Sequence, residues 1–115
     1  MKLEVGMYVK FKTLSNQVKV GQIQLIDNSI YELDNNEVTA DKYIVKASYD
    51  IIDILEVGDY VNGDKIFNID DCKGAMRQFY YDYENPNDDV GHWQEEIKSV
   101  ITHEQMEQMA YKVSD

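Results

Sequence analysis

Apolar and polar residues alternate in the first third of the chain with the two-residue period of a β-strand. In the range 7–12, methionine, valine and phenylalanine alternate with tyrosine and lysine, which is typical of a strand with one buried face. The ranges 18–26 and 30–33 continue as strands and are separated by a short polar turn. Gly21 lies inside the longer of these strands and predicts a bulge or a sharp bend.

Two further segments complete the first half. The range 43–49 has the same alternating pattern and predicts a fourth strand. The isoleucine-rich range 50–55 fits either a strand or one turn of helix. Five short strands joined by tight turns predict that residues 1–55 form a small SH3-like β-barrel.

One six-residue segment of the sequence occurs twice. The run EVGMYV at residues 4–9 returns as EVGDYV at residues 56–61, with one position changed. In each copy a glycine precedes a β-prone run, as expected where a strand begins after a turn. Strands at 66–69, 75–83 and 97–101 then predict that residues 56–101 form a second SH3-like β-barrel.

The chain ends with a helical pattern. Thr102 and Gln105 have the spacing of a capping box, so a helix over 102–113 is expected within the terminal segment 102–115. Its apolar face, which packs either on the chain's own barrels or in a homodimer, consists of Met106, Met109, Ala110 and Val113. The predicted fold is therefore mainly β, with two tandem SH3-like small β-barrels and a short C-terminal α-helix.

Charge excludes two classes of partner. The 22 acidic residues outnumber the 11 basic ones, and the net charge of −11 is concentrated in the second half of the chain. A basic patch for direct binding to nucleic acid or to an anionic membrane is therefore not expected. The single cysteine, Cys72, fits a reducing compartment, so we expect a soluble intracellular protein.

Catalytic, metal and cofactor sites are not expected. The range 85–96 resembles a calcium loop, but it has Asn85 where the first ligand should be aspartate and Val90 where glycine should stand. His92 and His103 have no partner at ligand spacing, and Cys72 has acidic neighbours that disfavour a thiolate. The sequence therefore predicts a protein that is not an enzyme.

The range 79–96 is the strongest candidate for a binding surface, because tyrosines, a tryptophan and carboxylates are interleaved there without any lysine or arginine. Part of this strand is expected to face the core, since alternate side chains point in opposite directions. The remaining face suits an arginine- and lysine-rich protein surface. The predicted partner-binding residues are Tyr81, Asp82, Tyr83, Glu84, Asp88, Asp89, Trp93, Glu95 and Glu96.

Two segments resemble a known group of proteins. The runs KASYDIIDILEVGDYVNG at 46–63 and IKSVITHEQME at 97–107 are similar to small, largely uncharacterised proteins encoded by phages and prophages of Gram-positive bacteria. The resemblance implies a phage accessory protein that acts in the bacterial cytoplasm. The matching segments identify no active-site residues. Small acidic phage proteins often antagonise host defence, as anti-CRISPR and anti-restriction proteins do.

Three functional hypotheses follow. In the first, the acidic surface mimics nucleic acid and binds a host protein with a basic, nucleic-acid-binding surface, such as a defence nuclease. In the second, the protein is a structural or assembly module of the phage, and its acidity serves only solubility. In the third, a pocket between the two barrels sequesters a small ligand.

Overall fold

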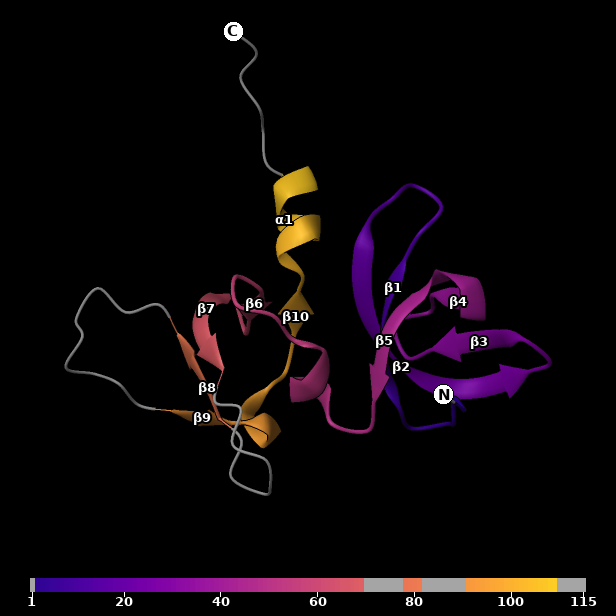
Figure 1. The fold of residues 1–115 in the computed structure, drawn as a ribbon, viewed down its shortest axis with the longest axis horizontal. Helices are drawn as coiled ribbons and strands as arrows, with labels where there is room; N and C mark the ends of the chain where they lie inside the picture. Colours follow the sequence, from indigo (N-terminus) through magenta and orange to yellow (C-terminus); the bar gives the residue numbers. More distant parts are fainter. Residues whose placement is uncertain (1, 70–77, 82–90, 110–115) are drawn as a thin grey trace, which may run out of the picture.

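The protein consists of two five-stranded antiparallel sheets and one short C-terminal helix, as Figure 1 shows. This computed structural model describes residues 2–69, 78–81 and 91–109. The prediction of a mainly β protein with a short C-terminal helix is confirmed. Among the described residues, no helix has the length and apolar character that crossing a bilayer requires.

The first sheet is formed by the first half of the chain. Its strands pair in the order β4-β3-β2-β1-β5, and the 3₁₀ helix η1 (Asp41–Tyr43) connects the two edge strands. Strand β4 was not predicted, because it is only three residues long and follows a polar loop directly. The bounds are β1 Tyr8–Lys12, β2 Val18–Asp27, β3 Ile30–Leu33, β4 Val38–Ala40 and β5 Ile44–Ser48.

The second sheet repeats this arrangement in the order β10-β6-β7-β8-β9, with a 3₁₀ helix, η3 (Gln94–Glu96), again before the last strand. The segment 50–55, for which strand and helix remained open, forms the 3₁₀ helix η2 (Ile51–Ile54). The remaining bounds are β6 Tyr60–Val61, β7 Asp64–Ile69, β8 Gln78–Tyr81, β9 His92–Trp93, β10 Val100–Ile101 and α1 His103–Met109.

The sheets are not closed into barrels, which corrects the barrel prediction. In the described part of the chain, each series of paired strands ends at two free edges, β4 and β5 in the first sheet and β9 and β10 in the second. Strands β4, β9 and β10 have only three, two and two residues. Edges this short offer few backbone groups for a closing ladder, and short edge strands are also a common defence against aggregation.

Several predicted strands differ in extent. The predicted strand 97–101 is reduced to the two residues of β10. The predicted strand 75–83 includes β8, and its other residues lie outside the described ranges. Gly21 pairs regularly with Val9, and the register irregularity of β2 lies further on, between Ile23 and Leu25. A Cβ at position 21 would lie 2.9 Å from a methyl carbon of Leu33 and 3.2 Å from its Cβ, so the Leu33 side chain would have to shift.

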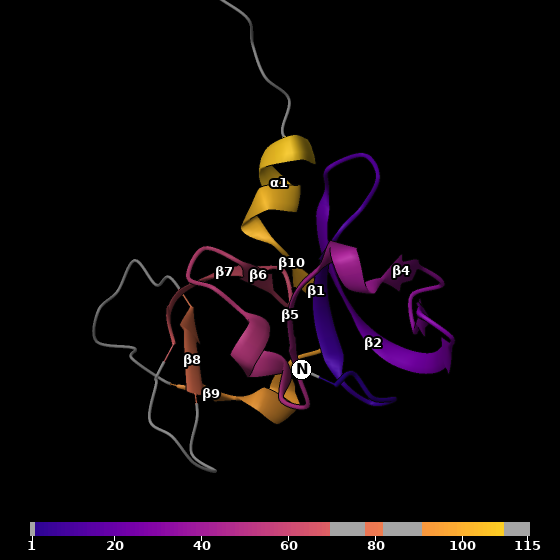
Figure 2. The ribbon, with the colours of Figure 1, turned by 45° about the vertical axis from the view of Figure 1, so that its right-hand side comes forward.

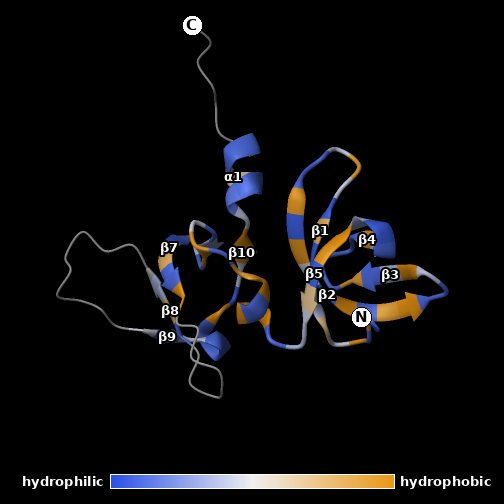
Figure 3. Ribbon diagram, in the orientation of Figure 1, coloured by the Kyte–Doolittle hydropathy of each residue, from blue (hydrophilic) through white to orange (hydrophobic). Residues whose placement is uncertain are grey.

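Each sheet has its own hydrophobic core, and Figure 3 shows the hydrophobic segments in both halves. Ile52 and Leu55 precede the predicted boundary at residue 56 but pack in the second core. The connecting helix η2 is therefore part of the second half's packing. The buried residues are Met7, Val9, Phe11, Ile23, Tyr31 and Leu33 in the first core, and Ile52, Leu55, Val61, Ile66 and Phe79 in the second.

Helix α1 lies between the two sheets in Figures 1 and 2. Thr102 caps it, because its Oγ1 accepts the Gln105 N–H at 3.0 Å, as the capping-box spacing predicts. The Gln108 side chain donates to the carbonyl of Asn16 at 2.8 Å and so fixes the helix to the first sheet. Met109 is 59% exposed, so the predicted apolar face is only partly covered, and its positions 110 and 113 lie outside the described residues.

Candidate functional site

The predicted partner-binding residues fall into two groups. Tyr81 is the last residue of β8 and pairs in register with Ile66. Trp93, Glu95 and Glu96 lie at the corner formed by β9 and η3. The others lie outside the described residues: Asp82, Tyr83, Glu84, Asp88 and Asp89.

At the β9–η3 corner, the three predicted side chains have different surroundings. Glu96 accepts the Trp93 N–H at 2.6 Å, and its Oε1 lies 3.4 Å from Nδ1 of His92. These two contacts lower the pKa of Glu96, the backbone bond having the larger effect. The Trp93 side chain is 39% exposed, and Glu95 is also exposed. Glu96 therefore stabilises the corner, whereas Trp93 and Glu95 are presented to solvent.

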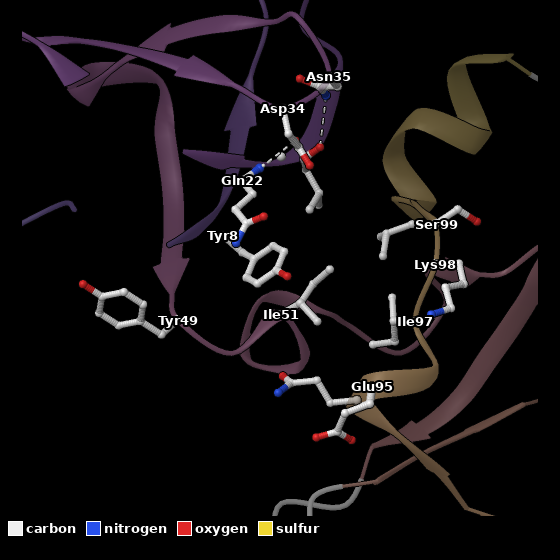
Figure 4. A pocket seen from close by; sticks show the side chains of 14 residues that line it. Tyr8, Gln22, Asp34, Asn35, Tyr49, Ile51, Glu95, Ile97, Lys98 and Ser99 are labelled. Atoms are coloured by element: carbon white, nitrogen blue, oxygen red, sulfur yellow. Dashed lines mark hydrogen bonds between the residues drawn. The ribbon is translucent and has the colours of Figure 1, made fainter. Parts of the chain in front are cut away.

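Glu95 also lines a groove of about 580 Å³ between the two halves of the molecule. One wall belongs to the first sheet, and the other is the segment that connects η3 to β10, as Figure 4 shows. Two carboxylates, Asp34 and Glu95, and one lysine, Lys98, line the groove. The other labelled side chains in Figure 4 are Tyr8, Gln22, Asn35, Tyr49, Ile51, Ile97 and Ser99.

The wall on the first sheet is held by hydrogen bonds between side chains and backbone. Asp34 Oδ1 accepts the Gln22 N–H at 3.0 Å, a bond that Figure 4 also shows. The Gln22 side chain donates to the Gly6 carbonyl at 3.0 Å, and Asn35 Nδ2 donates to the Val20 carbonyl at 3.3 Å. These contacts fix the polar groups of the wall before any ligand arrives, which lowers the entropic cost of binding.

The opposite wall is connected to the first half through Gln94. Its Oε1 accepts the Ile52 N–H at 3.0 Å, and its Nε2 donates to Asp50 at 3.2 Å. Asn62 supports the next residues, since its Oδ1 accepts the Lys98 N–H at 2.7 Å. Hydrogen bonds between side chains and backbone groups therefore hold both walls of the groove in place.

A second cluster of charged groups lies where α1 meets the two sheets. Lys10 is only 2% exposed, and its Nζ lies 3.2 Å from Glu56 and 3.7 Å from Glu104. Nε2 of His103 lies 3.1 Å from the other Glu56 oxygen and also contacts Glu104. Lys46 completes the cluster at 3.3 Å from Glu56. These charged contacts join four segments of the chain: β1, β5, the turn after η2 and α1.

The cluster changes the acidity of Glu56. The contact with His103 is the main cause, and together with Lys10 it lowers the Glu56 pKa to about 2. Burial acts in the opposite direction on neighbouring Asp59 and raises its pKa, although the carboxylate accepts the backbone N–H groups of Glu56 and His103. Glu56 is therefore fully ionised at neutral pH.

Glu56, His103 and Glu104 also resemble a metal-ligand set, because their ligand atoms lie within 4.8 Å of one another. The ammonium group of Lys10 already approaches both carboxylates of this set. A divalent cation would have to compete with that lysine, so the geometry favours a structural ion-pair network. The sequence-based expectation that the protein uses no metal and no cofactor stays a prediction.

No family model, curated protein or solved structure matches this chain. The resemblance to phage proteins therefore stays a prediction based on residues 46–63 and 97–107. Sequence reasoning identified Glu95 but missed Tyr8, Asp34 and Lys98 as parts of one groove. No local signal connects these three residues, because Tyr8 and Asp34 belong to the first half and Lys98 to the second, and the groove forms only where the two halves pack.

Proposed function

We propose that this chain is a non-enzymatic phage accessory protein that binds a basic, nucleic-acid-binding surface of a host protein and blocks it by mimicking nucleic acid. The observation that carries the proposal is the position of Glu95. It belongs to the acidic, aromatic surface predicted from the sequence and also lines the acidic groove between the two halves. A host defence nuclease has the basic surface that this arrangement fits.

Charge and side-chain chemistry support this binding mode. Trp93 is partly exposed beside Glu95, and aromatic residues beside carboxylates provide stacking and ion pairing for arginine. Asp34 adds a second carboxylate within the groove. Because the net charge is −11, long-range attraction would also speed the encounter with a cationic partner.

The proposal is tested by capture of host proteins on the immobilised full chain at about 0.1 M and 0.5 M salt, where exposed charge pairs pass from partial to strong screening. We expect capture of a nucleic-acid-binding protein that is lost at the higher salt. A variant with Asp82, Glu84, Asp88 and Asp89 changed to Asn or Gln should lose this capture, because it removes the predicted acidic surface.

The matched control removes the same charge elsewhere, at four exposed acids of the described chain: Asp27, Glu32, Asp64 and Glu107. Capture by this control should persist, since the change in net charge is equal but the predicted surface is intact. Equal capture by both variants would contradict the proposal. Salt-insensitive self-association would instead favour the phage assembly module, in which acidity serves only solubility.

A second function, sequestration of a small ligand, is favoured by the volume of the inter-sheet groove. At about 580 Å³, it falls in the range of small-molecule sites. This function predicts a concentration-dependent rise in melting temperature with a nucleotide or other polar metabolite. Lys98→Ala should abolish that rise if the ligand is anionic, because Lys98 is the lysine among the residues that line the groove.

The repeated strand order also supports a finer structural class. In both sheets the last strand pairs with the first, and a 3₁₀ helix precedes the last strand. We propose that each half, over residues 1–55 and 56–101, is an opened SH3-like unit, with Ile52 and Leu55 of the connecting segment packed on the second unit.

A further inference from the structure

A second pocket, of about 530 Å³, lies at the β4 edge of the first sheet and has a different chemistry from the groove. It is lined by the end of β1, the β1–β2 loop, β4 and η1. We call it the β4 pocket, and its main lining residues are Phe11, Leu14, Ile30, Val38, Thr39 and Tyr43.

Three apolar side chains of the β4 pocket are exposed to water. Leu14 is 90% exposed, Val38 58% and Ile30 51%. Single exposed apolar residues are ordinary, but three around one concave site form a surface suited to an apolar partner group. Figure 3 shows hydrophobic colour in the β1–β2 loop that overhangs this region.

A buried hydroxyl lies on the opposite face of β4, because Thr39 pairs across the sheet with the core residue Tyr31. Thr39 is 5% exposed, and its Oγ1 has no hydrogen-bond partner among the described residues. Burying a hydroxyl without a hydrogen-bond partner is unfavourable, so most such groups in proteins are satisfied. The Thr39 side chain is therefore part of the core face and is not offered to a ligand on the Val38 face.

Strand β4 also presents unpaired backbone groups. The Leu33 N–H bonds to the Glu37 carbonyl at 2.9 Å, which sets the alternation of the β3–β4 ladder. Thr39 then bonds toward β3, and the backbone groups of Val38 and Ala40 point outward. In the described part of the chain, β4 pairs only with β3. An added strand could therefore pair with the outer side of β4.

The charge of the β4 pocket is opposite to that of the groove. Its lining contains two lysines and one glutamate, in a chain that has twice as many acids as bases. Lys19 pairs with Glu37 at 2.7 Å, whereas Lys12 has no ion-pair partner within the described ranges. Lys42 lies over the ring of Tyr43, 5.1 Å from its centre, at the same edge. Lys12 is therefore available for an ion pair, and this favours a partner that carries carboxylates.

We propose that the β4 edge binds an extended peptide segment of a partner protein in which apolar residues alternate with acidic ones. The segment pairs with β4, places an apolar side chain among Leu14, Ile30 and Val38, and directs a carboxylate toward Lys12. The two-residue period of a strand separates these two kinds of side chain onto opposite faces. This site is independent of the acidic surface and selects a partner of opposite charge.

The test is a selection of random peptides displayed on phage against the immobilised full chain. We expect enrichment of peptides that alternate apolar and acidic residues. The Leu14→Ser/Ile30→Thr variant should bind the selected peptides about tenfold more weakly. The control Val45→Thr/Val57→Thr, at similarly exposed positions, should bind them as the unaltered chain does. Enrichment of basic peptides, or of none, would overturn the proposal, as would equal binding by both variants.

One further measurement separates pairing with β4 from non-specific binding. N-methylation of the peptide amides that pair with β4 should abolish binding. Unchanged affinity of the methylated peptides would rule out strand addition at this edge.

Discussion

The two glycine turns share one backbone conformation and differ in one side chain. Gly6 and Gly58 have φ angles of 98° and 101°, values that favour glycine. In the first turn the Ile23 N–H bonds to the residue after the glycine at 2.8 Å, and in the second the Ile66 N–H does so at 2.9 Å. The two copies of the repeated segment therefore have the same backbone conformation and the same backbone hydrogen bonds.

The changed position has opposite roles in the two copies. Met7 is 6% exposed and packs in the first hydrophobic core. Asp59, its counterpart, is fully buried and accepts the N–H of Glu56 at 2.7 Å and that of His103 at 2.9 Å. His103 begins helix α1, so Asp59 attaches the helix to the second turn.

Different residues determine the backbone of the turn and its contacts with the surrounding structure. Glycine and the β-prone residues after it specify the backbone. The following position can therefore serve its surroundings, an apolar core in one half and a helix terminus in the other. Two backbone donors meet the buried carboxylate of Asp59, whereas at position 7 the sulfur of Met7 accepts one, the Glu4 N–H at 3.3 Å.

The largest effect is expected when the first turn receives the residue of the second. Met7→Asp places a carboxylate in an apolar core that has no counterpart to the His103 N–H. We expect the free energy of unfolding to fall by about 4 kcal/mol or more, measured by urea denaturation. Met7→Leu is the control and should cost less than about 1.5 kcal/mol. Near-wild-type stability of Met7→Asp would mean that the two turns are interchangeable.

A smaller effect is expected when the second turn loses its carboxylate. Asp59→Ala leaves two buried N–H groups without an acceptor, and we expect a loss of about 2–3 kcal/mol. Asp59→Asn keeps one acceptor oxygen and avoids burying a charge, so it should cost less. Far-ultraviolet circular dichroism during urea denaturation measures both variants. Equal stability of Asp59→Ala and the wild type would show that α1 is held by other contacts.

The smallest effect concerns Glu56, whose pKa of about 2 in the folded protein lies below its ordinary value of 4.5. Because folding lowers this pKa, the ionised group stabilises the protein above about pH 4.5, and that stabilisation is lost as the pH falls toward 2. The side chain is 41% exposed, so after allowance for solvent screening we expect only about 1 kcal/mol.

Urea denaturation of the wild type and Glu56→Gln at a series of pH values measures this contribution. The stability difference between them should shrink on acidification through this window. The raised pKa of Asp59 has the opposite sign, because its stabilisation is present at low pH and is lost as the pH rises through the folded value. A constant difference between wild type and Glu56→Gln would contradict the assigned ion pairs.

Local patterns predicted most of the elements but not their edges. The alternation in 7–12 and 30–33 and the capping pair Thr102 and Gln105 correspond to β1, β3 and the start of α1. The sequence did not predict strands β4 and β9, because segments of three and two residues are too short to show an alternating pattern. Among the predicted partner-binding residues that the structure describes, only Glu95 lines the groove. The residues of the first-sheet wall are far from this segment in the sequence, so the local pattern did not indicate them.

The sequence by itself determined the mainly β class, the repeated turn and the acidic character, because each depends on residue type and short-range spacing. Only the tertiary structure decided that the sheets stay open, that Asp59 holds α1, and that an acidic groove and a lysine-bearing edge lie at different places. These features depend on which distant segments pack together. Packing and burial, rather than local conformational preference, set that choice.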